Sequence, residues 1–390
     1  MPNRAASRLV LADFSEEMVI KAARETRAEL GAEVSCAFVF FSIGYAEHLA
    51  DFLELVRVYG QVPLLVGCSG GGLVGTGHEA EDQEGFSLQL LSLPDTRLHV
   101  YEFSQKDVEE SSGPAYWQME SGVDAEAVDA WITLAHPARL DVERWLQEWN
   151  LAYPGVPTLG GLASGGREEG LVLVRDGQAV EGGAVAVGLR GGVRVHTIVS
   201  QGCRPIGEPL TITGARQNLL LTLGSKPAYG VLNTVFNGLT KQEKDRARNN
   251  LFAGLAMSEY LEDYKRGDFL IRNILGADSE AGAVAIGAPL RVGQTLQYQL
   301  RDRDSADEDL RELCYAAEEG GAKPFASLLF SCSGRGQGLF NAPHHDAGLL
   351  AEVFGAHPSA GFFCNGEIGP VGKANFLHGY TASAALLCDE

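Results

Sequence analysis

The sequence predicts an α/β protein of two domains, built from repeated βαβ units whose sheets mix parallel and antiparallel strands. Three observations carry this prediction. A segment of strand, helix, strand and glycine loop recurs three times along the chain. Its strands are unbroken apolar runs, which is typical of strands covered by helices on both faces. A proline (Pro63, Pro157 or Pro358) stands near the start of each second strand, where the backbone N–H that proline lacks is not needed for a hydrogen bond within the sheet.

The first copy begins with an apolar strand over residues 36–41. A helix is expected over 45–59, because Leu49, Phe52, Leu53 and Val56 form one apolar stripe at spacings of three and four. The second strand, over 62–69, runs into three consecutive glycines at 70–72, and residues 85–91 return as a strand. Loops at the carboxyl ends of such strands are where open α/β sheets bind ligands.

The second and third copies repeat this order. In the second copy we expect strands over 131–135 and 156–163, a helix over 140–149, and a closing pair of strands at 171–174 and 183–189 joined through the turn Asp176–Gly177. In the third copy we expect strands over 326–331 and 357–364, a helix over 345–354, and a closing strand over 376–387 with His378–Gly379 as the corresponding turn.

A different region separates the second and third copies. We expect strands over 196–203, 210–213, 218–223, 267–275 and 282–300, and helices over 228–236 and 241–264. The acidic run over 301–312 is expected to start a solvated helix that enters the third copy. At 390 residues two domains are the natural expectation, and we place them at 1–230 and 231–390.

Composition narrows the class of function. A formal net charge of −20 argues against a nucleic-acid footprint and against docking on an anionic membrane. No apolar run approaches the length of a spanning helix, and the first residues lack a signal-peptide pattern. The seven cysteines show neither CxxC pairs nor zinc-ligand spacing. We therefore expect a cytoplasmic protein with reduced thiols, and neither a nucleic-acid nor a membrane partner.

Two late loops carry the strongest polar signal. An apolar run ends in Ser331-Cys-Ser-Gly-Arg-Gly336, and a second ends in Cys364-Asn-Gly-Glu367. Arg335 and Glu367 are the only charged side chains in these loops, so we expect a polar small molecule where the loops converge. A guanidinium holds a carboxylate bidentately, and Glu367 would receive an ammonium group. The alternative is that Arg335 and Glu367 pair with each other and hold the two loops together.

The chain resembles the FIST family over residues 36–388. The runs SLLFSCSGRGQGLF, AGFFCNGEIGPVG and FLHGYTASAALL are similar to the C-terminal FIST domain; VPLLVGCSGGGLVG, VPTLGGLASGG and GCRPIGEPLTITGARQNLLLTLGSKPAYGVL are similar to the N-terminal one. The resemblance implies a sensory module of signal transduction that binds a small ligand such as an amino acid. It also implies a link to haem and nitric oxide sensing, which some relatives show. Asn365 stands where relatives often carry a smaller residue, so the identity of the ligand is not transferred.

The residues expected to bind the ligand combine the resemblance with the glycine-loop pattern: Cys68, Ser69, Gly70, Gly71, Ser331, Cys332, Ser333, Arg335, Gly336, Asn365, Gly366 and Glu367. Backbone N–H groups of these loops would complete the site, as in an anion-binding nest, although glycines needed only for tight turns are the commoner case. No catalytic residue, metal or cofactor is expected. The sequence carries no appended kinase, cyclase or methyl-accepting region, so we expect the output to lie in a separate signalling protein such as a kinase or cyclase.

Two alternatives remain open. An enzyme that uses Cys68 or Cys332 would need a nearby histidine or an electropositive environment to form a thiolate, whereas buried cysteines are commonly inert. A haem sensor would use a histidine such as His345 or His378 as an axial ligand, and the absence of CxxCH excludes covalent haem.

Overall fold

The structure is a computed structural model that describes residues 2–247, 250–261 and 263–390. By their contacts they form two compact units. The first comprises the chain up to Val199 together with Leu310–Leu377 and Thr381–Glu390; the second comprises Ser200–Asp309 and His378–Tyr380. These compact units are a different division of the chain from the sequence domains placed at 1–230 and 231–390. Gly230 lies within the second unit, and the segments before and after that unit build the first unit together.

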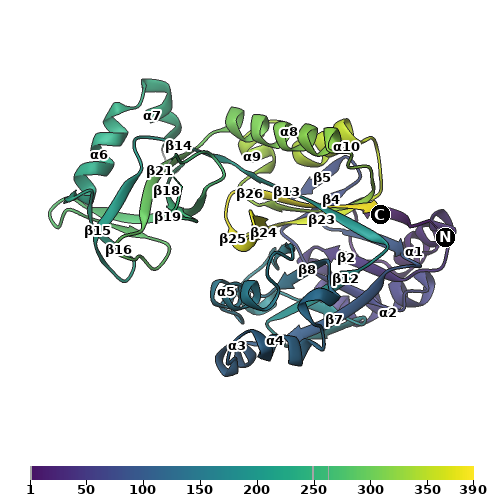
Figure 1. Ribbon diagram of the computed structural model, residues 1–390. Helices are drawn as coiled ribbons and strands as arrows, with labels where there is room; N and C mark the ends of the chain where they lie inside the picture. The colour runs from purple at the N-terminus through teal and green to yellow at the C-terminus, as the bar shows by residue number, and fades with distance from the viewer. Residues whose placement is uncertain (1, 248–249, 262) are drawn as a thin grey trace. The chain divides into compact units, whose positions relative to one another are not determined.

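Three six-stranded sheets make up the first unit (Figure 1). The first has the order β1 (Arg4–Val10), β6 (Phe86–Ser92), β2 (Cys36–Phe41), β3 (Leu65–Ser69), β10 (Leu173–Arg175) and β11 (Gln178–Val180). The second has the order β7 (Arg97–Phe103), β12 (Ala184–Arg190), β8 (Ala130–Ala135), β9 (Thr158–Leu162), β24 (Glu367–Val371) and β25 (Ala374–His378). The third has the order β13 (Val193–Gln201), β26 (Thr381–Asp389), β22 (Pro324–Cys332), β23 (Ser359–Cys364), β4 (Gly72–Gly75) and β5 (His78–Glu81).

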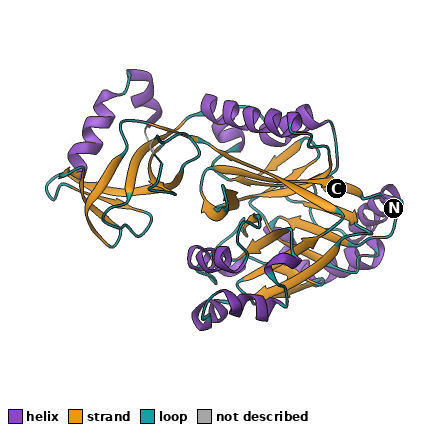
Figure 2. Ribbon diagram, in the orientation of Figure 1, coloured by secondary structure: helices purple, strands orange, loops and turns teal. Residues whose placement is uncertain are grey.

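Helices pack on the outer faces of these sheets, as Figure 2 shows. They are α1 (Glu16–Leu30), α2 (Leu49–Gly60), α3 (Gln105–Glu110), α4 (Pro114–Ser121), α5 (Val142–Ala152), α8 (Arg303–Glu319), α9 (Gly336–Phe340) and α10 (His345–Phe354). Short 3₁₀ turns lie at Ile43–His48, directly before α2, at Ala125–Ala127 and at Glu168–Gly170. The helix predicted over 45–59 is thus a 3₁₀ turn followed by α2, and the acidic run after residue 301 leads into α8.

The three predicted copies are confirmed by their strand pairing. In each copy the two strands that flank the crossover helix are parallel neighbours: β2 with β3, β8 with β9, and β22 with β23. In each pair a glycine stands opposite the middle of the first strand, at Gly67, Gly160 and Gly361. The ideal Cβ of each glycine would lie 1.7–1.9 Å from a carbonyl oxygen of the facing strand, so the same close approach recurs three times.

The hairpins differ from the prediction, because each copy gives its hairpin to another copy. The hairpin β10–β11 of the second copy pairs with β3 of the first. The hairpin β24–β25 of the third copy pairs with β9 of the second, and β4–β5 of the first copy pairs with β23 of the third. The turn Asp176–Gly177 therefore joins β10 to β11, whereas the sequence had it lead into the strand over 183–189. This cyclic exchange gives all three sheets the same strand order.

One apolar core fills the space between the inner faces of the three sheets. It contains Phe40, Phe330 and Phe362, whose ring centroids lie 5.0–6.2 Å apart. Alternate residues of the same strands face outward, so that Val39 and Phe41 pack against α1 and α2. Both faces of each central strand are covered, and this explains why the strands appear in the sequence as unbroken apolar runs.

In its described residues, the second unit is a closed antiparallel sheet with two helices. Its order is β14 (Cys203–Pro205), β21 (Thr295–Arg301), β15 (Leu210–Arg216), β16 (Leu219–Leu223), β20 (Ala283–Ile286), β19 (Phe269–Asp278) and β18 (Leu251–Ala256), with β17 (Lys226–Pro227) beside β16. Because β18 also pairs with β21, the path closes on itself.

The helices of the second unit are α6 (Ala228–Gly238) and α7 (Lys241–Ala247). The single helix predicted over 241–264 is wrong, because strand β18 begins at Leu251; positions 248, 249 and 262 of that range lie outside the described residues. Pairing with β19 and β21 holds Leu251–Ala256 as a strand, and those partners lie outside the local sequence window.

Candidate functional site

The three glycine loops that follow β3, β9 and β23 meet in the first unit. The site predicted from the sequence included the loops after β3 and β23. Ser164, in the loop after β9, joins all three. Its hydroxyl donates to the carbonyl of Phe363 at 2.5 Å and accepts from the N–H of Gly71 at 2.9 Å, and its own N–H donates to the carbonyl of Ser69 at 3.1 Å. The site prediction omitted Ser164, although the match between Ala163-Ser-Gly165 and Cys68-Ser-Gly70 in the sequence could have identified it.

The loops are packed directly against one another. An ideal Cβ on Gly70 would lie 2.7 Å from the Cβ of Phe362, and one on Gly165 would lie 2.5 Å from the carbonyl oxygen of Gly70. The N–H of Gly70 donates to Phe41, and the N–H of Gly71 donates to Phe363. These glycines therefore serve close packing, and their N–H groups do not form the anion-binding nest considered above.

Arg335 is held by Asp346, a residue that the site prediction omitted. The Nε and Nη2 atoms of Arg335 donate to the two carboxylate oxygens of Asp346 at 2.7 and 2.9 Å, and both side chains are buried. Ser331 donates to the same carboxylate at 2.8 Å. Burial alone would raise the pKa of Asp346, but Arg335 and His345 beside it lower that pKa well below its ordinary value. The bidentate carboxylate expected on Arg335 is thus supplied by the chain itself.

Glu367 is a second buried acid at the same loops. It accepts hydrogen bonds from the N–H of Thr381 at 3.1 Å and from the thiol of Cys364 at 3.4 Å. Burial raises the pKa of Glu367 to about 8. Hydrogen bonds from Thr381 and from the thiols of Cys364 and Cys332, together with the positive charge of Arg335, oppose this rise. Arg335 and Glu367 are thus brought near each other, with Asp346 as the bidentate partner of Arg335.

The remaining predicted residues take up different environments. Cys68 and Ser69 are buried in β3, and the hydroxyl of Ser69 accepts from the N–H of Val172 at 3.1 Å. Ser333 and Asn365 reach solvent. Gly336 begins α9 with a φ of 58°, and its ideal Cβ would lie 2.5 Å from the carboxylate of Glu81, which accepts from the N–H of Gln337. The carbonyl oxygen of Gly366 accepts from the N–H of Leu162 at 2.9 Å.

The cysteines give no sign of an activated nucleophile. All seven are buried, and none of them forms a disulfide. Burial raises the pKa of Cys68 well above its ordinary value, and burial together with the Glu367 carboxylate does the same for Cys364. Cys332 and Cys364 stand opposite each other on β22 and β23, beside Glu367. A carboxylate neighbour and burial both disfavour thiolate formation.

The histidines of the haem alternative have different surroundings. His345 stacks on Phe340 at 3.3 Å between ring centroids, and its Nδ1 lies 2.9 Å from Asp346. His378 is 3% exposed and belongs to the second unit. Among the described residues, no three His, Cys, Asp or Glu side chains cluster as a metal site. The haem alternative stays a prediction.

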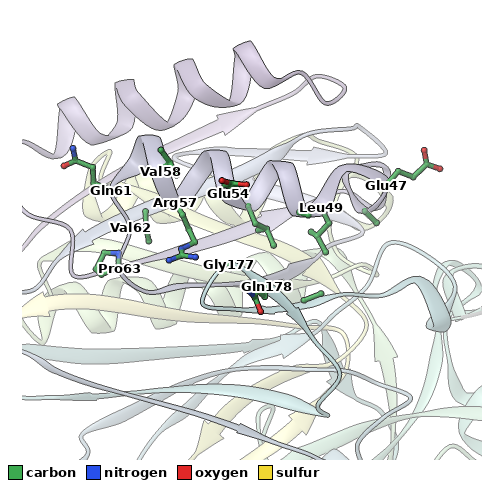
Figure 3. A pocket seen from close by; sticks show the side chains of 14 residues that line it. Glu47, Leu49, Glu54, Arg57, Val58, Gln61, Val62, Pro63, Gly177 and Gln178 are labelled. Carbon is green, nitrogen blue, oxygen red and sulfur yellow. The ribbon is translucent and has the colours of Figure 1, made fainter.

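A hollow of about 1040 Å³ lies in the first unit, between α2 and the hairpin β10–β11 (Figure 3). It was missed by the site prediction, which followed the glycine loops. One wall is α2 with the residues just before and after this helix, and the other wall is the hairpin. The lining residues are Ala46, Glu47, Leu49, Ala50, Leu53, Glu54, Arg57, Val58, Gln61, Val62, Pro63, Gly177, Gln178 and Ala179. The hairpin comes from the second copy, so only the exchange of hairpins forms this hollow.

Opposite charges and an apolar floor characterise the hollow. Arg57 reaches from α2 toward Gly177, and an ideal Cβ on Gly177 would lie 2.1 Å from the Cδ of Arg57 (Figure 3). Glu54 lies one turn earlier on the same helix. Within the described residues, neither Arg57 nor Glu54 makes an ion pair or a side-chain hydrogen bond. Leu53 and Val62 are buried beneath them.

Comparison with known proteins found matches over most of the chain. The FIST N domain matches residues 35–226 and the FIST C domain matches residues 228–370. The uncharacterized protein Rv0628c of Mycobacterium tuberculosis is 37% identical over 372 residues, which cover 95% of each chain. The uncharacterized protein Mb0898c of Mycobacterium bovis is 36% identical over 379 residues, which cover 96% of each chain. Among solved structures, a cyanuric acid hydrolase from A. caulinodans is 12% identical, with a TM-score of 0.33 over 98% of this chain and 99% of its own.

Proposed function

The chain belongs to the FIST family, whose domains are small-ligand sensory domains of signal transduction, and we propose that it is a non-catalytic receptor for an amino acid or a similar small zwitterion. The ligand would bind in the hollow between α2 and the hairpin β10–β11, within the FIST N domain. The output would pass through a separate signalling protein such as a kinase or cyclase.

The single observation that carries this proposal is that the hollow places two oppositely charged side chains without an ion-pair partner among the described residues, Arg57 and Glu54, beside buried apolar residues. Arg57 would hold the ligand carboxylate bidentately, since a planar guanidinium matches a carboxylate. Glu54 would accept hydrogen bonds from the ligand ammonium group. Leu53 and Val62 would contact the apolar part of the ligand, and a hollow of about 1040 Å³ is ample for a molecule of this size.

The hollow is better suited to this role than the glycine loops. The guanidinium of Arg335 already holds a carboxylate, and a ligand at that position would have to displace Asp346 from a buried, hydrogen-bonded pair. Arg57 and Glu54 face no such competitor among the described residues. Binding there requires no rearrangement of the core.

Binding at this hollow has a physical route to the rest of the first unit. A ligand held by α2 and by Gln178 would join the first copy to the hairpin of the second. The chain that enters this hairpin donates from Val172 to Ser69, in the loops where all three copies meet. The proposed signal is a change in the stability of this exchange of hairpins.

No helix within the described part of the chain combines the length and apolar character that crossing a bilayer requires.

The test is thermal unfolding of the full chain against the twenty amino acids, together with their decarboxylated and deaminated analogues. A compound that binds only the native state at about 100 times its Kd stabilises it by about 2.7 kcal/mol, which raises the Tm measurably. We expect one group of amino acids to raise the Tm and both kinds of analogue to lose most of the effect. Arg57→Ala should remove the response to the carboxylate, and Glu54→Gln the response to the ammonium group.

A matched control is available on α5, the equivalent helix of the second copy. Arg144 is exposed and forms an ion pair with Glu148, one turn away. Arg144→Ala should leave the ligand response intact. The proposal fails if none of the amino acids shifts the Tm, or if Arg57→Ala responds to the ligand as the unmodified protein does.

A further inference from the structure

The second unit contains a hollow of about 910 Å³ that differs in chemistry from the one beside α2. It lies between one face of α6, the segments that precede α6 in the chain and the start of the segment that follows it. The lining residues are Arg204, Pro205, Ile206, Gly207, Glu208, Leu210, Lys226, Pro227, Gly230, Val231, Thr234, Val235, Gly238, Leu239 and Glu243. Its volume is within the range of small-molecule sites, which are mostly apolar with few polar groups.

The wall formed by α6 is apolar for a specific reason. Val231 and Val235 lie one helical turn apart on the face that lines the hollow. Thr234 lies on the same face, but its hydroxyl donates to the carbonyl of Gly230 at 2.8 Å. The hydroxyl is thus satisfied by its own helix, and the hollow receives no donor from this residue.

Gly230 is explained neither by backbone conformation nor by packing. It lies inside α6 without a positive φ, and its ideal Cβ would meet no atom within 4 Å. A glycine inside a helix costs about 0.5–1 kcal/mol relative to alanine. The glycine leaves the hollow open at this position, because any larger side chain would occupy part of its volume.

The lining contains two cationic and two anionic side chains, and two of these four form an ion pair with each other. Arg204 forms an ion pair with Glu243 and lies 3.5 Å from Asp302. Hydrogen bonds from the N–H and hydroxyl of Thr240 lower the pKa of Glu243, so that it stays ionised beside Arg204. Lys226 and Glu208 remain, of opposite sign and both exposed. The hollow therefore presents apolar surface without a net charge that would select an ion.

We propose that this hollow is a second ligand site of the protein, for an uncharged and predominantly apolar small molecule. It is independent of the polar site at Arg57, since it uses only residues of the second unit. A receptor with both sites would respond to two chemically different signals.

The experiment measures binding of a series of linear alcohols, from hexanol to decanol, to the full chain by calorimetry and by thermal shift. Affinity should rise about fourfold for each added methylene, which corresponds to about 0.8 kcal/mol. At equal chain length the carboxylate and the alkylammonium ion should both bind more weakly than the alcohol. Arg57→Ala should leave all of these affinities unchanged.

Substitutions locate the site. Gly230→Leu should weaken alcohol binding by about tenfold or more, equivalent to about 1.4 kcal/mol. Gly230→Ala should raise the Tm slightly and weaken binding less. Gly348→Ala in α10 is the matched control, because Gly348 is also helical with open space around its Cβ. It should raise the Tm without changing alcohol affinity. Lys226→Met should have no effect on binding.

Three outcomes would overturn the proposal. Saturable binding of no alcohol at all would show that the hollow is not a small-molecule site. Tighter binding of the carboxylate or of the ammonium ion would show that charge, and not apolar contact, selects the ligand. An unchanged alcohol affinity in a folded Gly230→Leu protein would place binding elsewhere.

Discussion

Arg335 and Asp346 face each other inside the first unit, joined by hydrogen bonds of 2.7 and 2.9 Å, and their side chains are 0% and 1% exposed. This pair ties the loop after β22 to the first turn of α10. His345 and Ser331 complete the surroundings of the carboxylate. The charged residue that stands out most in the sequence is therefore a structural residue in this fold, and the exposed Arg57 is the better candidate for ligand recognition.

Removing the guanidinium should destabilise the protein strongly. Arg335→Ala leaves Asp346 charged and buried, and breaking a buried pair in this way costs about 3–5 kcal/mol. Urea unfolding of the variant measures the loss. Arg311→Ala is the control, since Arg311 forms an exposed pair with Glu352 that should be worth no more than about 1 kcal/mol. A loss at Arg335 as small as the loss at Arg311 would contradict the structural role.

The stability of the protein should fall as the pH rises through the range in which Glu367 ionises. The pKa of a glutamate in the unfolded chain is about 4.3, whereas burial raises the pKa of Glu367 to about 8 in the folded protein. Between these values the native state holds a proton that the unfolded state has released. Stability is therefore full below the lower value and declines by up to about 1.4 kcal/mol per pH unit above it.

Glu367→Gln tests this dependence. The amide keeps an acceptor for the N–H of Thr381 but does not titrate, so the variant should gain stability over the unmodified protein as the pH rises from 5 to about 8. Denaturant unfolding at several pH values measures the difference. Burial also raises the pKa of Glu79, to about 7, so part of the dependence should remain. Parallel curves for the two proteins would show that Glu367 is ionised throughout.

The recurring glycine of the second strands should not tolerate a side chain. In Gly361→Ala the new Cβ would lie 1.8 Å from the carbonyl oxygen of Leu329, so β22 and β23 must separate. We expect a loss of about 3 kcal/mol or more, measured by thermal unfolding and soluble yield. The equivalent changes at Gly67 and Gly160 should have similar effects. Gly338→Ala, where the Cβ meets nothing within 4 Å, should be nearly neutral.

The cysteines should react slowly with thiol reagents in the native protein. All seven are buried, and burial raises the pKa of Cys68 and Cys364 well above the ordinary value. Titration with a disulfide reagent near neutral pH should label none of them quickly, and unfolding in guanidinium should expose all seven. A native thiol that reacts faster than free cysteine would instead support a cysteine-dependent enzyme.

Local patterns predicted the repeated units well. The run Cys36–Phe41 has six apolar residues in succession, which is typical of a strand covered on both faces, and β2 has these bounds. The stripe of Leu53 and Val56 predicted α2, because their spacing places them on one helix face. These signals depend on residues close together in the chain.

Pairing between distant segments limited the prediction. The region after Lys241 looks helical locally, yet Leu251–Ala256 pairs with β19 and β21, and those contacts override its propensity. The strand over 171–174 was expected to join the strand over 183–189 in its own copy, because the turn Asp176–Gly177 is visible in the sequence, whereas its pairing with β3 leaves no local signal. The hollow beside Arg57 was missed for the same reason, since its two walls belong to different copies.

The sequence by itself determined three βαβ units, their parallel strand pairs, the FIST resemblance and the convergence of glycine loops, because each follows from apolar periodicity, turn residues or short motifs. Only the tertiary structure decided which hairpin completes which sheet, that Asp346 neutralises Arg335, and where unengaged charges border a hollow. These features depend on contacts between residues far apart in the chain, and a linear pattern holds no information about which of several equivalent strand edges a hairpin will join.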